Sequence, residues 1–183
     1  MSESLKGRLI VASPALTDPN FHRSVVLVLE HSAEGALGVV LNQPTDIVAR
    51  QALPEAIGRA LPEGAVVYRG GPVQPEAVIL LADFAVPEEA AGIAFGTVGI
   101  VDPQGDTERL SASVRAIRAF GGYAGWAAGQ LEEEFAHEAW IEAVGLPEDV
   151  FTREPRALWS RVLERKGGRF LLVARMPEDP SLN

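Results

Sequence analysis

The segment FGGYAGWAAGQLEEEFAHEAW, residues 120–140, carries the strongest information about the fold of this chain. It places Gly121, Gly122 and Gly125 around Tyr123 and Trp126, and it then continues into an acidic stretch. Glycine is used where the backbone needs a positive φ or where another group approaches closely. The pattern therefore predicts an unusual, tightly packed corner rather than an ordinary linker.

Size and composition are those of one globular domain. The chain has 183 residues, of which 47% are hydrophobic and 22% are charged, and it contains no cysteine. A cysteine-free chain has no disulfide or thiolate nucleophile and fits a reducing compartment. The N-terminus lacks the apolar core of a signal peptide, and the longest aliphatic run, Val25–Leu29, is too short to cross a bilayer. We expect a soluble, cytoplasmic protein with no membrane association.

Short apolar runs predict the strands. Val25–Leu29 and Leu37–Leu41 are separated by the turn cluster Ser32–Gly35, which predicts an antiparallel hairpin. The first run is aliphatic throughout, as expected for a strand covered on both faces. Further strands are predicted at Leu9–Ala12, Val66–Tyr68, Val78–Leu81, Ile93–Val101 (one or two strands), Val114–Phe120, Trp140–Val144 and Phe170–Val173.

The longest helix is predicted at Pro155–Lys166. Thr152 is a plausible cap, Pro155 suits the first turn, and Gly167 ends the helix. Shorter helices are expected at Thr107–Ser113 and after the glycine-rich segment, where three apolar residues recur at helical spacing: Ala127, Leu131 and Phe135.

The region Asp46–Leu61 also has helical character. Pro54 would divide it into two short helices, with Asp46 capping the first. The order of elements is irregular, so it predicts the α+β class rather than a regular βαβ alternation. We expect a mixed, largely antiparallel β-sheet flanked by a few helices, in a single domain of residues 1–183 with a flexible C-terminal tail at about 176–183.

Three segments together resemble the YqgE/AlgH family, also called UPF0301 or DUF179. Its signatures match, in order and spacing, LKGRLIVASPALTDPNFHRSVVLVLEHSAEGALGVVLNQP (residues 5–44), YRGGPVQPE (68–76) and GYAGWAAGQLEEE (122–134). The resemblance covers essentially the whole chain and implies a single-domain bacterial α+β protein whose biochemical function is unassigned. The name AlgH also implies a transcriptional regulator. The net charge of -9 and the lack of a readable helix-turn-helix argue against direct nucleic-acid binding.

One candidate catalytic group lies within seven residues: Asp18, His22 and Ser24. An acid, an imidazole and a hydroxyl are the components of an acyl-transfer site. Proximity in sequence does not orient a nucleophile and a base, however. We favour a structural interpretation, in which Asp18 or Asn20 caps a single helical turn and Phe21 anchors that turn in the core.

Two glycine-rich segments are candidate ligand-binding elements. Consecutive glycines after a strand can present backbone N–H groups to an anion, and two aromatic rings with a nearby amide can line a slot. Close backbone approach and an aromatic core explain the same residues without a ligand. The candidate ligand-binding residues are Arg69, Gly70, Gly71, Gln74, Tyr123, Trp126 and Gln130.

The histidines do not have the spacing of a metal site. His22, His31 and His137, with Asp18, Glu30 or Glu138, lack the HExxH pattern, so we expect neither a metal nor a cofactor. The leading hypothesis is a binding, interaction or regulatory module without its own catalytic centre, acting on an unknown protein or small-molecule partner. The alternatives are a hydrolase-like enzyme using the Asp18 group and a transcriptional regulator.

Overall fold

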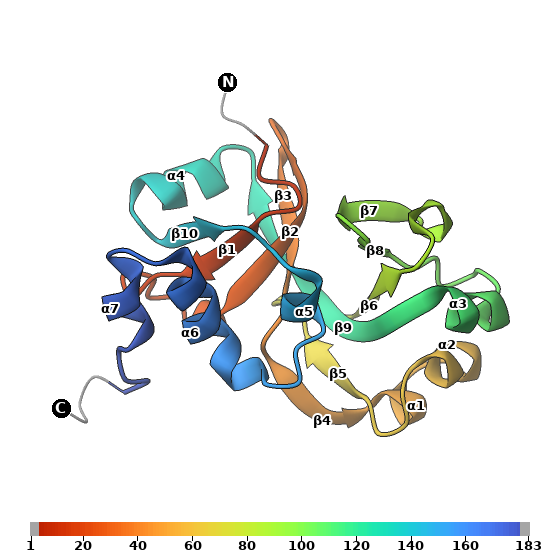
Figure 1. The fold of residues 1–183 in the computed structure, drawn as a ribbon. Helices are drawn as coiled ribbons and strands as arrows, with labels where there is room; N and C mark the ends of the chain where they lie inside the picture. The colour runs from red at the N-terminus through yellow and green to blue at the C-terminus, as the bar shows by residue number, and fades with distance from the viewer. Residues whose placement is uncertain (1–3, 180–183) are drawn as a thin grey trace.

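Strand β9 (Val114–Ala127) joins the two halves of one sheet in the computed structural model, which describes residues 4–179 (Figure 1). The strand order is β10-β1-β2-β3-β9-β6-β8-β7, with β4 and β5 beside the centre. Within the described residues the strand pairs are antiparallel except for β5 and β9. The remaining strands are β1 Leu9–Ala12, β2 Val25–Ser32, β3 Gly35–Val40, β4 Pro44–Val48, β5 Val66–Arg69, β6 Val73–Phe84, β7 Gly92–Phe95, β8 Val98–Ile100 and β10 Trp140–Ala143.

Helices lie on both sides of this sheet and confirm the α+β class in a single domain. One group, at the left of Figure 1, covers the half of the sheet that contains β1 and β2, and another lies near β5 and β6. No helix within residues 4–179 is both long and apolar enough to cross a membrane. The α-helices are α1 Ala49–Ala52, α2 Glu55–Ala60, α3 Thr107–Ser113, α4 Gln130–Ala136, α5 Pro147–Val150, α6 Pro155–Lys166 and α7 Phe170–Ala174.

The glycine-rich segment is a bent part of β9 and not a corner that ends the strand. Phe120 pairs with Ile79 of β6, and Ala124 pairs with Gly38 of β3, so the chain passes through the glycines without leaving the sheet. Gly122 has a φ of 72°, and the register of β6 shifts where it passes this residue. The prediction of a corner was wrong because β9 continues through the glycines, and the extra residues of this irregularity belong to β6, where residues 74–77 lie opposite Gly122.

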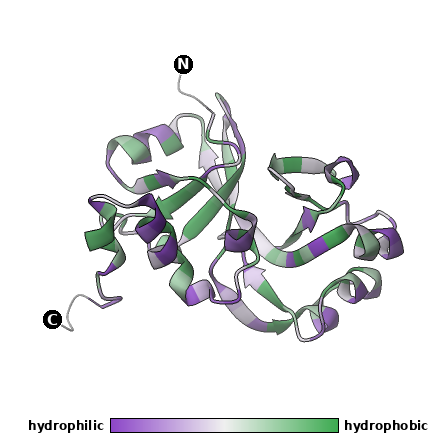
Figure 2. Ribbon diagram, in the orientation of Figure 1, coloured by the Kyte–Doolittle hydropathy of each residue, from purple (hydrophilic) through white to green (hydrophobic). Residues whose placement is uncertain are grey.

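The core is divided by the β1–β2 part of the sheet. Val25 and Leu27 pack on the face covered by α6, while Val26 and Val28 pack on the face covered by α4. This arrangement confirms that residues 25–29 of β2 are covered on both faces, and Figure 2 shows the hydrophobic colour of β1 and of the first part of β2. A third cluster lies between the β6–β9 part of the sheet and the helices α1, α2 and α3.

Two predicted elements differ in type from the observed ones. Phe170–Val173 belongs to helix α7 instead of a strand, because Gly167 and Gly168 have positive φ and turn the chain back onto α6. An apolar run of four residues does not distinguish strand from helix. Asp46 lies in strand β4, so it does not cap α1, which begins at Ala49.

Smaller differences concern helix ends. Thr152 is not the N-cap of α6: that position is Glu154, whose backbone N–H donates to the Thr152 hydroxyl at 3.1 Å. Ala127 is the last residue of β9, and α4 begins at Gln130 after Gly129, whose φ is 76°. The other predicted strands, the α3 and α6 helices and the division at Pro54 are confirmed, although β6 and β9 are longer than predicted. Strand β4 was not predicted, and its residues 46–48 lie in the region expected to be helical. Of the predicted C-terminal tail, residues 180–183 lie outside the described residues.

Candidate functional site

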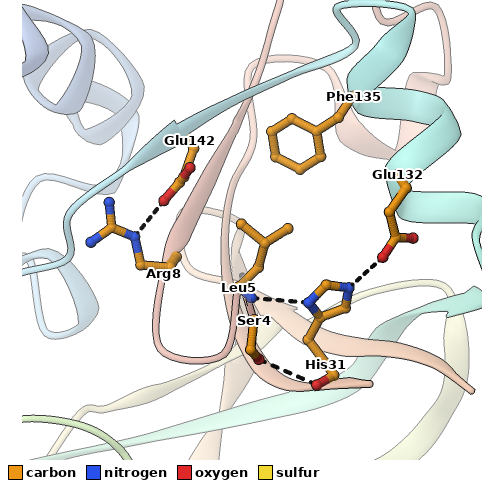
Figure 3. Close-up of a pocket in the computed structure, with 7 residues that line it drawn as sticks. All are labelled: Ser4, Leu5, Arg8, His31, Glu132, Phe135 and Glu142. Atoms are coloured by element: carbon orange, nitrogen blue, oxygen red, sulfur yellow. Dashed lines mark hydrogen bonds and ion pairs between the residues drawn. The ribbon is translucent and has the colours of Figure 1, made fainter. Parts of the chain in front are cut away.

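A cavity of about 490 Å³ lies where helix α4 faces the N-terminal segment and strand β10 (Figure 3). It is formed by parts of the chain that are distant in sequence. The N-terminal segment, the end of β2, α4 and β10 all contribute side chains. Its lining residues are Ser4, Leu5, Arg8, His31, Glu132, Phe135 and Glu142.

Helix α4 supplies a carboxylate and an aromatic ring to the cavity. Glu132 and Phe135 are three residues apart, a spacing that places both side chains on the same face of a helix. Leu131 is buried in the cluster beneath and holds α4 against the sheet. The position of both cavity residues is therefore set by the packing of the helix.

Glu134 also holds this helix in place, through two tryptophans. The indole N–H groups of Trp126 and Trp140 both donate to Oε2 of Glu134, at 2.9 and 2.7 Å. The two rings meet edge to face, and Phe21 stacks against Trp126. One carboxylate therefore satisfies the polar atoms of two core aromatic residues and fixes α4 relative to β9 and β10.

A bulge in β2 brings His31 to the α4 side of the sheet. The register with β3 shifts between Val28 and Glu30, so His31 lies opposite Ala36, which packs against the α4-side cluster. Without the bulge, the alternation of a strand would place residue 31 on the same face as Leu27. The extra residue in β2 is thus what allows His31 to reach the cavity.

Both ring nitrogens of His31 are engaged. The backbone N–H of Leu5 donates to Nδ1 at 2.9 Å, and Nε2 lies 2.8 Å from Oε1 of Glu132. Because Leu5 can only donate, Nδ1 accepts and the ring proton is on Nε2, which donates to the carboxylate. The His31 side chain is only 5% exposed. The uncharged imidazole therefore links the N-terminal segment to α4 and has no free nitrogen to act as a base.

Glu132 is the ionised group of this pair. The backbone N–H of Glu132 itself, at the start of α4, is the first cause that lowers the pKa of its carboxyl, and the hydrogen bond from His31 is the second. Unpaired N–H groups at a helix N-terminus favour negative charge. Glu132 carries a full negative charge at neutral pH, with only a neutral imidazole as its partner.

The opposite wall holds a paired charge. Arg8 Nε donates to Oε1 of Glu142 at 2.6 Å, so these two charges balance one another. Glu142 lies opposite Ile10 in the β1–β10 ladder, and Ile10 belongs to the α4-side cluster. Figure 3 shows the terminal nitrogens of Arg8 on the side away from Leu5 and Phe135.

The predicted catalytic residues are close in sequence but differ in environment. Asp18 caps the 3-10 turn Pro19–Phe21 by accepting from the N–H of Asn20 at 2.8 Å, and Phe21 packs into the α4-side cluster. His22 is exposed, and its side chain makes no hydrogen bond to any other described residue. Ser24 is 0% exposed, and its hydroxyl has no partner within residues 4–179. The geometry orients neither a base nor an acid toward Ser24.

The glycine-rich candidates meet one another outside the cavity. A Cβ on Gly70 would lie 2.3 Å from the carbonyl oxygen of Gly122, and one on Gly71 would lie 2.1 Å from the carbonyl carbon of Tyr123. Close backbone approach therefore accounts for both glycines. The Arg69 guanidinium reaches across to Oδ1 of Asn20 at 2.7 Å, so this segment does meet the Asp18–Ser24 segment.

The aromatic candidates do not form a common slot. Tyr123 packs against the α6-side cluster and Trp126 belongs to the α4-side cluster, on opposite faces of the sheet. Gln130 accepts from the N–H of Ala127 and donates to Glu134, while Gln74 is exposed. A ligand-binding role for these residues stays a prediction.

The three histidines are distributed over separate environments. His31 is committed to Leu5 and Glu132, and His137 Nδ1 lies 2.8 Å from the carbonyl oxygen of Glu133. No group of three or more histidines and acids with the geometry to hold a metal ion is found among the described residues.

Comparison with known proteins connects the fold to one family. The model of the DUF179 family, described as AlgH-like, matches residues 9–171. A UPF0301 protein of Streptomyces coelicolor is 45% identical over 188 residues, covering 98% of this chain and 96% of that protein. A UPF0301 protein of Thermobifida fusca is 41% identical over 194 residues, with the same coverage of each chain.

Solved structures agree with this match. The crystal structure of a Corynebacterium diphtheriae protein is similar with a TM-score of 0.85 and 28% identity, covering 95% of this chain and 93% of that one. The solution structure of the AlgH protein from Pseudomonas aeruginosa is similar with a TM-score of 0.72 and 28% identity, covering 97% and 98%. These matches confirm the resemblance of the three sequence signatures, and the chain belongs to the AlgH-like family DUF179, also named UPF0301.

Proposed function

We propose that this protein is a binding module without its own catalytic centre, and that it takes a small molecule in the cavity between α4 and β10. The observation that carries the proposal is the form of this cavity. Its volume of about 490 Å³ is within the range of small-molecule sites, roughly 300–1,000 Å³. The side chains of Leu5 and Phe135 form an apolar surface, here called the apolar bed, and the polar lining groups surround it.

The state of the polar groups favours binding over chemistry. Both nitrogens of His31 are engaged, and the hydroxyl of Ser4 donates to the carbonyl oxygen of His31 at 3.3 Å. A nucleophile needs a free base within hydrogen-bond reach. The lining groups are held in fixed positions by one another, as in a site that recognises a ligand without transforming it. A cytoplasmic location is part of this proposal, supported by the cysteine-free sequence.

A fragment screen by ¹H–¹⁵N chemical-shift mapping tests this proposal. The library contains cationic, anionic and neutral fragments, each added to the wild-type protein and to Phe135→Ala. We expect the largest shifts at Leu5, Arg8, His31 and Glu132, and we expect them to diminish in the variant. A library that shifts none of these residues, or shifts residues elsewhere equally in both proteins, contradicts the proposal.

A further inference from the structure

The cavity between α4 and β10 has an unbalanced negative charge. Arg8 and Glu142 form an ion pair and cancel. His31 is uncharged, because its Nδ1 accepts from the Leu5 N–H. Glu132 is then the lining charge that no cation balances.

The free acceptor positions of the cavity belong to carboxylates. Oε1 of Glu132 is bonded to His31 and Oε1 of Glu142 is bonded to Arg8, and no other residue within 4–179 donates a hydrogen bond to the Oε2 atom of either carboxylate. Figure 3 shows these two carboxylates on opposite sides of Leu5 and Phe135. A ligand on the apolar bed therefore meets a carboxylate at either end.

The cation of the cavity is not available to an anion there. The terminal nitrogens of Arg8 lie away from Leu5 and Phe135 (Figure 3), and Arg8 also lines a second, smaller cavity together with Arg165 and Lys166. A ligand carboxylate placed on Phe135 would face Glu132 and Glu142 without a counter-charge. Like charges in a partly buried site disfavour binding.

We propose that this cavity selects an organic cation, namely a primary ammonium that carries a small apolar or aromatic body. The inference rests on the proposed binding function and specifies its ligand class. The ammonium donates to the carboxylate of Glu132, and the apolar body lies between Leu5 and Phe135. Phe135 is one turn along α4 from Glu132, and an aromatic ring beside a carboxylate attracts a cation by its quadrupole as well. The net charge of -9 draws cations toward the protein surface in general.

Three probes of the same shape and different charge test this selection: benzylammonium, benzyl alcohol and benzoate. Their dissociation constants are measured by calorimetry and their positions by ¹H–¹⁵N shift mapping, at low and at physiological salt. We expect benzylammonium to shift Leu5, His31 and Phe135, and to bind about tenfold more tightly than either of the other probes.

Two variants with the same change of charge separate the cavity from the general field. Glu132→Gln is expected to weaken benzylammonium binding about tenfold, whereas Glu133→Gln, on the exposed side of α4, leaves it unchanged. Phe135→Leu keeps the apolar bed and is expected to weaken the aromatic probe while the preference for the cation remains. The ¹H–¹⁵N spectrum of each variant verifies its fold.

Each of three other outcomes would overturn the preference of the cavity for a cation. Benzoate or benzyl alcohol binding in the cavity as tightly as benzylammonium would overturn the cation preference and leave the proposed binding function standing. An equal loss in Glu133→Gln and Glu132→Gln would show attraction by net charge alone and would also overturn it. If none of the three probes shifts the cavity residues, the cation inference is wrong, and the full fragment library then decides the binding function separately.

Discussion

Nε2 of His31 lies 2.8 Å from Oε1 of Glu132, although 101 residues separate the two in the chain. The bond joins the end of β2 to the first turn of α4 and forms one wall of the cavity. The other ring nitrogen of His31, Nδ1, accepts from the backbone N–H of Leu5, so a single imidazole sets the position of two walls of the cavity. The shape of the cavity therefore depends on the two hydrogen bonds of His31.

Replacement of His31 by phenylalanine should destabilise the protein by about 2–3 kcal/mol, because the Leu5 N–H loses its acceptor in a mostly buried setting. Urea unfolding followed by far-UV circular dichroism measures this change. His22→Phe is the matched control: His22 is exposed and its side chain bonds to none of residues 4–179, so we expect a change within about 0.5 kcal/mol. Equal losses in the two variants would contradict the structural role of His31.

Glu134→Ala should cost about 2–4 kcal/mol, because it leaves the indole N–H groups of Trp126 and Trp140 without their shared acceptor. Both tryptophans are nearly fully buried, so their fluorescence should also shift as water reaches the rings. The control Glu133→Ala removes an exposed acid from the same helix and should change stability by less than about 0.5 kcal/mol. Unchanged tryptophan emission in Glu134→Ala would be the opposing result.

Gly71→Ala should prevent folding or cost more than about 3 kcal/mol, since the new Cβ would lie 2.1–2.4 Å from backbone atoms of Tyr123 and Ala124. Soluble yield and thermal unfolding measure the effect. Gly64 also has a positive φ, of 75°, but a Cβ there meets nothing within 4 Å. Gly64→Ala should therefore cost only the backbone term, about 1–2 kcal/mol. A Gly71→Ala variant that loses no more stability than Gly64→Ala would show that β9 and the Gly70–Gly71 segment do not approach this closely.

The carboxyl of Glu132 should titrate below the value of an unstructured glutamate, about 4.3. Because the folded-state pKa is lowered, the stabilisation that comes from this group is present above its unfolded pKa and is lost as pH falls through the folded pKa. A ¹³C NMR titration of the side-chain carboxyl measures the midpoint. His31→Phe removes one of the causes of the shift, so the pKa of Glu132 should rise in that variant. A wild-type midpoint at or above the ordinary value would contradict this electrostatic description.

Local patterns were sufficient for most of the fold. The aliphatic run of β2 predicted burial on both faces, and Pro155 with Gly167 marked both ends of α6, because these signals act over one or two turns of chain. The prediction of a strand at Phe170–Val173 was wrong for a tertiary reason, since the two preceding glycines fold this segment back onto α6. The glycines of β9 were correctly identified as sites of close approach, but the partner that approaches them, Gly70–Gly71, is about fifty residues away in the chain.

The cavity had no comparable local signal. Arg8 and Glu142 are separated by 134 residues, and their pairing follows from the β1–β10 ladder. His31 was considered as a metal ligand because of its residue type. Its orientation depends on a bulge in β2, and no glycine or other turn residue marks this bulge in the sequence. The sequence predicted Phe135 on the core face of this helix with Leu131, and it did not predict that Glu132 borders the same space. That signal alone could not show that this face borders a cavity instead of open solvent.

A crystal structure of the protein with benzylammonium tests the central claim most directly. The account predicts the ammonium nitrogen about 3 Å from Oε2 of Glu132, with the ring lying between Leu5 and Phe135 and with Nδ1 of His31 still bonded to Leu5. The same experiment with Glu132→Gln should give a clearly lower occupancy of the probe in the cavity at the same probe concentration. Density for the probe elsewhere on the surface, or in the cavity with its nitrogen turned away from both carboxylates, would contradict the account.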